Sequence, residues 1–118
     1  MKLKFITLMV RDLKKSIAFY ENLTGLRVLK RMSPGMGEIA FLANRDGETM
    51  LELIQFDSAE KVSAKGMTFS FLAEGDLEPY RENAVALGYN PSDIVTSGPK
   101  PSHFVVLDPD GVLVEISN

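Results

Sequence analysis

The sequence predicts an α+β protein made of two tandem βαβββ modules, and three observations support this prediction. Short apolar and β-branched runs alternate with only two segments of helical spacing, which is typical of mixed strands and helices. Landmark residues recur at one interval: Gly25 and Gly88 lie 63 positions apart, and so do Glu52 and Glu115. An internal repeat of this kind indicates that both halves of the chain form the same unit.

The repeat also predicts the domain organisation. A chain of 118 residues has the length of one domain with one or two small cores. We expect a first module at about 1–57, a linker at about 58–65 and a second module at about 66–118. The linker is small and polar, and it ends at Gly66. The whole chain is therefore expected to form a single domain with two similar halves.

In the first module, apolar residues alternate along 3–10, which predicts a strand with two different faces. Asp12 is expected to cap a helix, because its carboxylate can accept hydrogen bonds from the free N–H groups of the first helical turn. Gly25 is the expected stop of that helix. Turn residues then separate three further strands, expected at about 26–33, 38–44 and 48–56.

The second module repeats this order. A strand is expected at about 67–73, followed by a helix at about 77–87 that Asp76 caps and Gly88 stops. A short strand is expected near 93–97. A loop rich in Ser, Gly and Pro then leads to a closing hairpin.

That hairpin has the clearest local signal in the chain. The turn 108–111 reads Asp-Pro-Asp-Gly, in which Pro presets one corner and Gly accepts the left-handed one. A three-residue loop would place Glu115 opposite Val105. His103 would then lie two residues along on the same face, within diagonal reach of roughly 7–8 Å.

Composition excludes several classes of protein. The net charge is −3 and the isoelectric point is about 5.1, so no basic stripe is available for phosphates and we expect no nucleic-acid partner. No apolar run approaches the roughly 20 residues that span a bilayer, so we expect no membrane partner. The absence of cysteine excludes disulfides, thiolate nucleophiles and cysteine-bound metals. A cytoplasmic protein is the resulting expectation.

Motifs across the whole chain resemble the vicinal oxygen chelate superfamily, which contains glyoxalase, extradiol dioxygenases and bleomycin-binding proteins. The matching motifs are Val10-Arg11-Asp12-Leu13, Phe19-Tyr20, Gly25-Leu26, Leu51-Glu52-Leu53 and Asp108-Pro109-Asp110-Gly111 with Glu115. The resemblance implies that the sheets curl around a cleft, and that the protein is a homodimer. It also implies metal ligands on the first and last strand of each module.

Two of the four implied ligand positions hold residues that suit a metal poorly. Glu52 and Glu115 occupy the last-strand positions, but Phe5 and Thr68 match the first-strand positions. A phenyl ring cannot bind a metal, and two carboxylates alone would leave most of the coordination to water. No cofactor is therefore favoured. If a divalent metal does bind, Glu52, Glu115 and His103 are its candidate ligands.

Two functions follow from the resemblance. One is a small-molecule binding protein without a metal, whose ligand is neutral or cationic and partly apolar. The other is an enzyme of lyase, isomerase or dioxygenase type, with or without a divalent metal, in which Glu52, Glu115 and perhaps His103 are catalytic. In that case two carboxylates in one cavity would raise the pKa of one of them, which would provide an acid and a base.

The candidate ligand-binding residues share the expected cleft-facing parity of their strands. They are Phe5, Thr7, Met9, Met50, Ile54, Thr68 and Ser70. Each site residue also has a structural reading. The apolar members could be core packing or a dimer contact, the two glutamates a solvated relic of a metal site, and His103 a surface residue at a strand end.

Overall fold

The computed structural model describes residues 1–118 as two compact units, Met1–Val62 and Ser63–Asn118. Part of the expected linker belongs to the first unit, because the N–H of Val62 donates to the carbonyl of Met9 at 2.8 Å. No helix in the chain is both long enough and apolar enough to cross a lipid bilayer.

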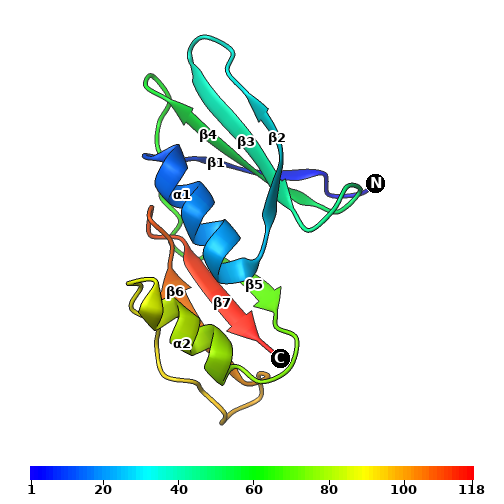
Figure 1. Ribbon diagram of the computed structural model, residues 1–118, viewed down its shortest axis with the longest axis vertical. Coiled ribbons are helices and arrows are strands. Elements are labelled where there is room, and N and C mark those ends of the chain that lie inside the picture. The colour runs from blue at the N-terminus through cyan, green and yellow to red at the C-terminus, as the bar shows by residue number, and fades with distance from the viewer. The chain divides into compact units, whose positions relative to one another are not determined.

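The first unit is a four-stranded mixed sheet with one helix on it (Figure 1). Its elements are β1 (Phe5–Met9), α1 (Leu13–Phe19), the π-helical turn η1 (Tyr20–Thr24), β2 (Arg27–Met32), β3 (Gly37–Ala43) and β4 (Met50–Phe56). The strand order is β1-β4-β3-β2, with β1 parallel to β4 and the other pairs antiparallel. The expected helix and four strands of this module are confirmed.

Two side chains fix the start of α1. The Asp12 carboxylate accepts a hydrogen bond of 3.1 Å from the Lys15 N–H, which is the expected cap. The Gln55 side chain on β4 accepts a second one of 2.7 Å from the Leu13 N–H, and so ties the helix to the sheet. At the other end, Gly25 has a φ of 76°, the left-handed geometry that stops a helix.

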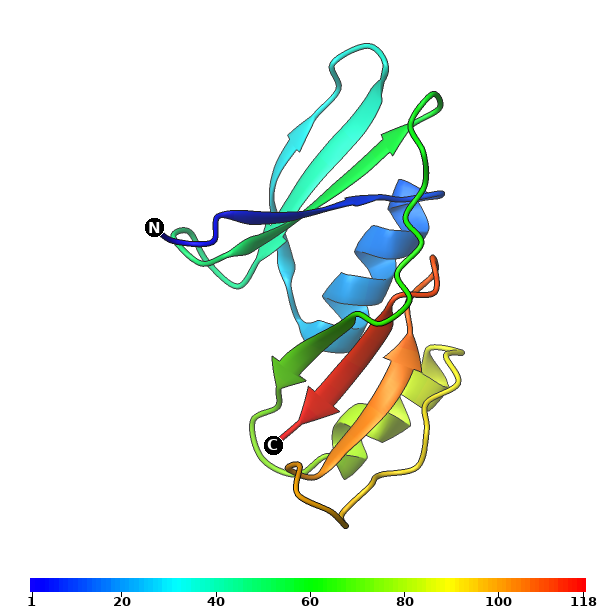
Figure 2. The ribbon, with the colours of Figure 1, turned by 180° about the vertical axis from the view of Figure 1, so that it is seen from behind.

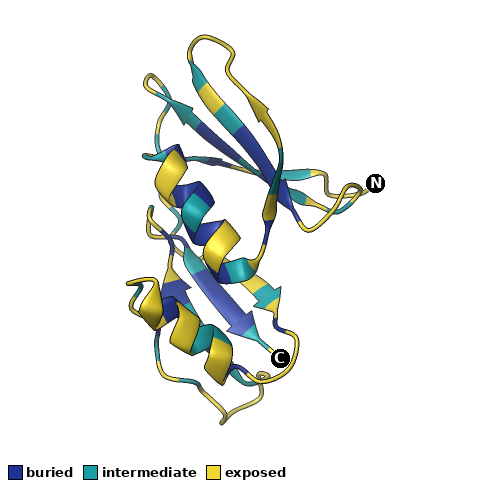
Figure 3. Cartoon of the chain, viewed as in Figure 1, coloured by how far each residue is buried: buried dark blue, intermediate teal, exposed yellow.

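The two faces of the first sheet differ, because α1 covers only one of them. Leu8, Leu42 and Leu53 are fully or almost fully buried and share one face of the sheet. The contact of Gln55 with the start of α1 puts the helix on this same face, and Figures 1 and 3 show α1 against the sheet. Strand alternation places the side chains of Phe5, Thr7 and their neighbours on the opposite face. That second face is free of a helix and carries all the candidate ligand-binding residues of this unit.

The second unit is a three-stranded mixed sheet with α2 against one of its faces, behind the sheet in Figure 2. Its elements are β5 (Thr68–Leu72), α2 (Glu78–Ala86), β6 (His103–Leu107) and β7 (Leu113–Ser117). The order is β5-β7-β6, with β5 parallel and β6 antiparallel to β7. The predicted hairpin register is confirmed, because Glu115 pairs with Val105 and His103 with Ser117.

The prediction of a strand near 93–97 is wrong. Only Val95 forms a bridge, to His103, while the Ser92 hydroxyl accepts from the Val105 N–H at 3.0 Å. The Ser92 side chain therefore accepts the hydrogen bond that a backbone carbonyl of a neighbouring strand would otherwise accept. The prolines that flank this stretch, at 91, 99 and 101, also lack the N–H that a ladder requires.

The prediction that Asp76 caps the second helix is also wrong. Leu77 occupies the N-cap position with helical dihedral angles, and no side chain caps the helix. Leu77 is 2% exposed, so its burial fixes the start of the helix without help from Asp76. Pro79 stands in the first turn, where its missing N–H costs little, and Gly88 has the expected left-handed geometry after the last turn.

Candidate functional site

The helix-free face of the first unit is largely apolar. The parallel register pairs Phe5 with Met50, Thr7 with Glu52 and Met9 with Ile54, so all six side chains lie on one face. Phe41 of β3 pairs with Glu52 and extends the face. Ile54 and Phe41 are buried, and Phe5, Met9 and Met50 are half-buried.

Glu52 lies in the middle of this face. Its carboxylate accepts a hydrogen bond of 2.5 Å from the Thr7 hydroxyl, and it has no ion pair. The side chain is half-buried among apolar neighbours. An unneutralised carboxylate in such surroundings can accept further hydrogen bonds or attract a cation.

Two adjoining pockets of about 320 and 330 Å³ lie at the start of β1 and β4. Both share Lys4, Phe5 and Met50 as lining residues. The first is completed by Lys2, Leu3, Gly47 and Glu48, and the second by Leu29, Lys30, Phe41 and Asp46. Their size is within the range of small-molecule sites.

Aromatic contacts form the wall of the larger pocket. The Phe5 and Phe41 ring centroids are 5.1 Å apart, with the ring planes inclined by 50°. The Lys4 ammonium lies 5.1 Å from the Phe5 centroid, within cation–π range. The wall therefore combines apolar area with a cation beside the Phe5 ring.

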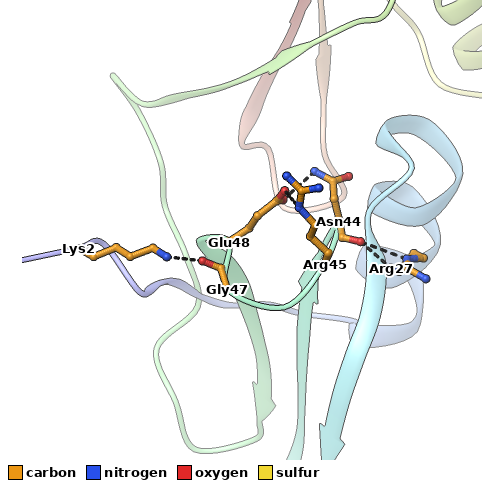
Figure 4. A network of polar contacts seen from close by, with 6 residues as sticks. All are labelled: Lys2, Arg27, Asn44, Arg45, Gly47 and Glu48. Carbon is orange, nitrogen blue, oxygen red and sulfur yellow. Dashed lines mark hydrogen bonds and ion pairs between the residues drawn. The ribbon is translucent and has the colours of Figure 1, made fainter.

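Polar contacts hold the rim of the smaller pocket in place (Figure 4). The Lys2 ammonium donates to the Gly47 carbonyl in the turn between β3 and β4. Glu48 forms an ion pair of 3.1 Å with Arg45 and accepts from Asn44 at 3.1 Å (Figure 4). These contacts join the start of the chain to the turn and shape the pocket mouth.

The second unit repeats the polar pair of the first. Ser70 donates a hydrogen bond of 2.8 Å to Glu115, and Thr7 and Glu52 occupy equivalent places on their strands. Both pairs join residues 45 positions apart. The surroundings differ, because Glu115 is only 6% exposed and forms an ion pair with Lys100.

The Lys100 and Ser70 hydrogen bonds lower the pKa of Glu115, and they outweigh burial, which acts in the opposite direction. The positive charge of Lys100 and the nearby His103 act in the same direction as these bonds. The raised pKa that was expected for one of the two glutamates is therefore not found at Glu115. The carboxylate is held in its charged form, because a lysine lies beside it.

His103 lies on the same face as Glu115, as the predicted register requires. Its Nδ1 donates a hydrogen bond of 2.8 Å to the Pro101 carbonyl, so in the neutral ring Nε2 is the free acceptor. The side chain is half-buried. The contact fixes the orientation of the ring and anchors the end of the loop that carries Lys100.

The structure brings some predicted residues together and separates others. Thr7 meets Glu52, Ser70 meets Glu115, and Phe5 and Met50 line the pockets. Thr68 pairs with Leu113 and is exposed. Within each unit the predicted faces are found, and a cleft shared by both glutamates stays a prediction.

Sequence reasoning missed the basic residues of both faces. Lys4 and Lys30 line a pocket, and Lys100 neutralises Glu115. The only signal for Lys100 is its place between two prolines in the loop before β6, and that signal does not reveal the acid it reaches. Strand alternation could not place a residue that lies outside a strand.

A resident divalent metal does not fit these donors. Phe5 has no lone pair, and Lys100 already occupies one carboxylate oxygen of Glu115. A metal ion bound there would have to displace the ammonium of Lys100. No group of three His, Asp or Glu side chains is arranged to hold a metal ion.

The family model of the Glyoxalase/Bleomycin resistance protein/Dioxygenase superfamily matches residues 2–116, and the chain belongs to this superfamily. The resemblance derived from the motifs is thereby confirmed, as is the fold class.

One protein is similar to this chain in sequence, and two others are similar to it in structure. The chain is 32% identical over 113 residues to the uncharacterized protein YwbC of Bacillus subtilis (strain 168), covering 92% of this chain and 90% of that protein. The trypanothione-dependent glyoxalase I of Leishmania major is 23% identical, with a TM-score of 0.82 over 100% of this chain and 86% of that one. The antibiotic-binding protein TnmS3 of Streptomyces sp. CB03234 is 19% identical, with a TM-score of 0.77 over 99% of this chain and 94% of that one.

Proposed function

We propose that this protein binds a small molecule without a resident metal, and that the ligand has an apolar, partly aromatic body and a neutral or cationic polar end. The observation that carries the proposal is the helix-free face of the first unit. There a pocket of about 330 Å³ lies against Phe5, Phe41 and Met50, and Glu52 follows two residues along the same strand face. The expected ligand-binding residues thus include two that line a pocket.

The apolar part of this face favours a ligand that buries surface. Burial of apolar area contributes roughly 25 cal/mol per Å², so a ring seated between Phe5 and Met50 would gain several kcal/mol before the entropic cost of binding. Methionine adapts to irregular ligand shapes because its side chain is unbranched and flexible. TnmS3, whose structure is similar to this chain, is an antibiotic-binding protein, and a comparable role is consistent with this wall.

Charge selects among such ligands. Lys4 and Lys30 bring two positive charges to the pocket, and Asp46 and Glu52 bring two negative ones to the pocket and the adjoining face. The two positive and two negative charges balance, so they do not disfavour a neutral ligand. Glu52 is half-buried and the two lysines are exposed, so a positive group that reaches the middle of the face should be attracted to Glu52.

Calorimetric titration with three matched aromatic probes tests this proposal: benzyl alcohol, benzyltrimethylammonium and benzoate. We expect the alcohol and the ammonium to bind and the benzoate to bind at least about tenfold more weakly, a difference of about 1.4 kcal/mol. Glu52→Gln should lose the preference for the ammonium, and Phe5→Ala should weaken both probes that bind. Glu38→Gln removes a carboxylate from the opposite face of the same sheet and should change neither.

Two results would contradict the proposal. Tighter binding of benzoate would mean that the lysines and not Glu52 decide the charge of the ligand. Binding that survives Phe5→Ala and Met50→Ala together would place the ligand elsewhere in the protein.

One observation favours a second candidate, an enzyme of lyase or isomerase type. The Nδ1 contact of His103 leaves Nε2 as a base on the face that carries Glu115, and Glu52 offers an unneutralised carboxylate on the first unit. Proton transfer needs groups of this kind. Activity on a superfamily substrate that Glu52→Gln and His103→Gln both abolish, with folding intact, would favour the enzyme.

A further inference from the structure

Glu115 is a buried acid whose cationic partner comes from outside the sheet. The glutamate is 6% exposed and stands on the central strand β7, where Ser70 of β5 donates to one carboxylate oxygen. Lys100 donates to the other oxygen from the loop before β6. The Lys100 side chain itself remains 58% exposed, so solvent reaches the ammonium from one side.

The loop is built to present this lysine. Lys100 stands between Pro99 and Pro101, whose rings restrict the backbone on both sides of it. His103 donates to the Pro101 carbonyl and fixes the end of the loop. We call residues 97–101 the lysine strap, because they carry one cation across the end of the sheet to a buried acid.

We propose that the face of the second unit is a cation site whose occupant is the chain's own Lys100. A buried carboxylate requires a positive partner, and here the strap supplies it. A hard cation, such as a divalent metal ion, could reach Glu115 only after displacing the ammonium. The inference concerns the second unit alone and holds whether or not a ligand binds to the first.

The two units provide an internal comparison. Glu52 accepts from a hydroxyl as Glu115 does, but no lysine or arginine occurs in the loop that precedes β3, residues 33–36. Glu52 accordingly has no ion pair and is half-buried. A hydroxyl–carboxylate pair is thus open in one unit and closed by a tethered cation in the other.

Tethering makes the closure effective. A group on a short loop competes as if it were present at millimolar concentration or more, because its encounter with Glu115 is intramolecular. A free cation at lower concentration is therefore excluded, even where its intrinsic attraction to the carboxylate equals that of the lysine. Removing the charge at position 100 should convert the closed site into an open one.

Mn²⁺ is a suitable probe, because this paramagnetic ion broadens amide signals near the place where it binds. In the intact protein, we expect no selective broadening of the Ser70, Val105 and Glu115 amides. In Lys100→Met, these amides should broaden at Mn²⁺ concentrations at least about tenfold lower than any that affect the intact protein. Lys100→Gln tests the same point with a neutral hydrogen-bond donor if the methionine variant fails to fold.

Three matched variants complete the test. Lys100→Arg keeps the charge and should behave like the intact protein. Lys65→Met removes a lysine from the start of the same unit and should show no gain, which excludes an effect of net charge. The double variant Lys100→Met with Glu115→Gln should lose the gain, because the acid that binds the ion is gone.

The inference is overturned if Lys100→Gln folds and gains no Mn²⁺ binding at these amides, or if Lys65→Met gains as much. Equal broadening in the intact protein would overturn it as well, because the strap would then exclude nothing. None of these results bears on the aromatic probes of the first unit, so this inference and the proposed function can fail separately.

Discussion

The Ser70 hydroxyl donates to the Glu115 carboxylate across two parallel strands, and the same contact joins Thr7 to Glu52 in the first unit. The pairing follows from topology. The first and last strands of each unit lie side by side, so residues 45 positions apart face each other in both units. The repeat in the sequence therefore extends to individual polar contacts.

The depressed pKa of Glu115 predicts a pH dependence of stability. The charged form is favoured in the folded state, so its contribution is present above the unfolded pKa and is lost as pH falls through the lower folded value. Glu115→Gln should cost about 1–2 kcal/mol at pH 7, because a charge-assisted bond to a partly exposed lysine is removed. Urea unfolding at a series of pH values measures both effects.

The difference between the intact protein and Glu115→Gln should shrink below about pH 5, where the unfolded chain takes up the proton first. Glu52→Gln is the control for a glutamate at the equivalent position. A constant difference from pH 7 to pH 3 would mean that the lysine contact does not act in solution.

The turn between β6 and β7 depends on Asp108. Its carboxylate accepts from the Asp110 N–H at 2.8 Å and from the Val112 N–H at 2.9 Å, and the residue is 5% exposed. Asp108→Ala should lower the free energy of unfolding by about 2–3 kcal/mol, because two donors lose their partner. Asp108→Asn keeps an acceptor oxygen and should cost less. Equal losses in the two variants, measured by urea unfolding, would contradict this account.

Gly37 should tolerate no side chain. Its φ is 149°, and a Cβ there would lie 2.0 Å from the Gln55 carbonyl oxygen, which is backbone and cannot turn aside. Gly37→Ala should destabilise the protein by roughly 2 kcal/mol or more, since β3 must shift from β4. Gly35→Ala is the matched control, because no atom lies within 4 Å of its Cβ position and only the backbone cost remains. Similar thermal midpoints for the two variants would refute this.

The donor set predicts that the purified protein carries no stoichiometric divalent metal. Phe5 and Thr68 stand where ligands were expected from the family resemblance, and Lys100 engages Glu115. Elemental analysis should find well below one equivalent of Zn, Ni, Fe or Mn per chain. About one equivalent, lost in Glu52→Ala, would show that the protein coordinates a metal by other means.

A dimer is expected in solution. On the second unit, Leu72 and Leu107 are 82% and 60% exposed and share the face of Glu115, and such apolar area usually has a partner. Light scattering at micromolar concentration should give twice the chain mass, and Leu107→Lys should reduce it. A monomer mass for the unchanged protein would refute this prediction.

Local signals predicted most of the fold. The alternation and the Asp-Pro-Asp-Gly turn are properties of neighbouring residues. Together with the repeat, they gave the observed strands, the first helix and the β6–β7 register correctly. The stretch near 93–97 failed because a serine side chain replaces strand hydrogen bonds there. Asp76 failed as a cap because the burial of Leu77 sets the start of the helix.

The candidate site was less predictable, for a physical reason. Alternation assigns a strand residue to a face, and so it brought Thr7 to Glu52 and Ser70 to Glu115. It carries no information about where a loop side chain ends. Lys100 therefore escaped prediction, although it neutralises the charge of Glu115 on the second face.

The asymmetry of the two glutamates bears on how this protein could acquire new specificities. Glu115 is bound by contacts on both oxygens, so most replacements there would reduce the yield of folded protein. Glu52 has a single hydroxyl partner and a half-exposed setting. A mutant library for directed evolution should therefore be randomised at Glu52, where a change of charge carries little folding penalty.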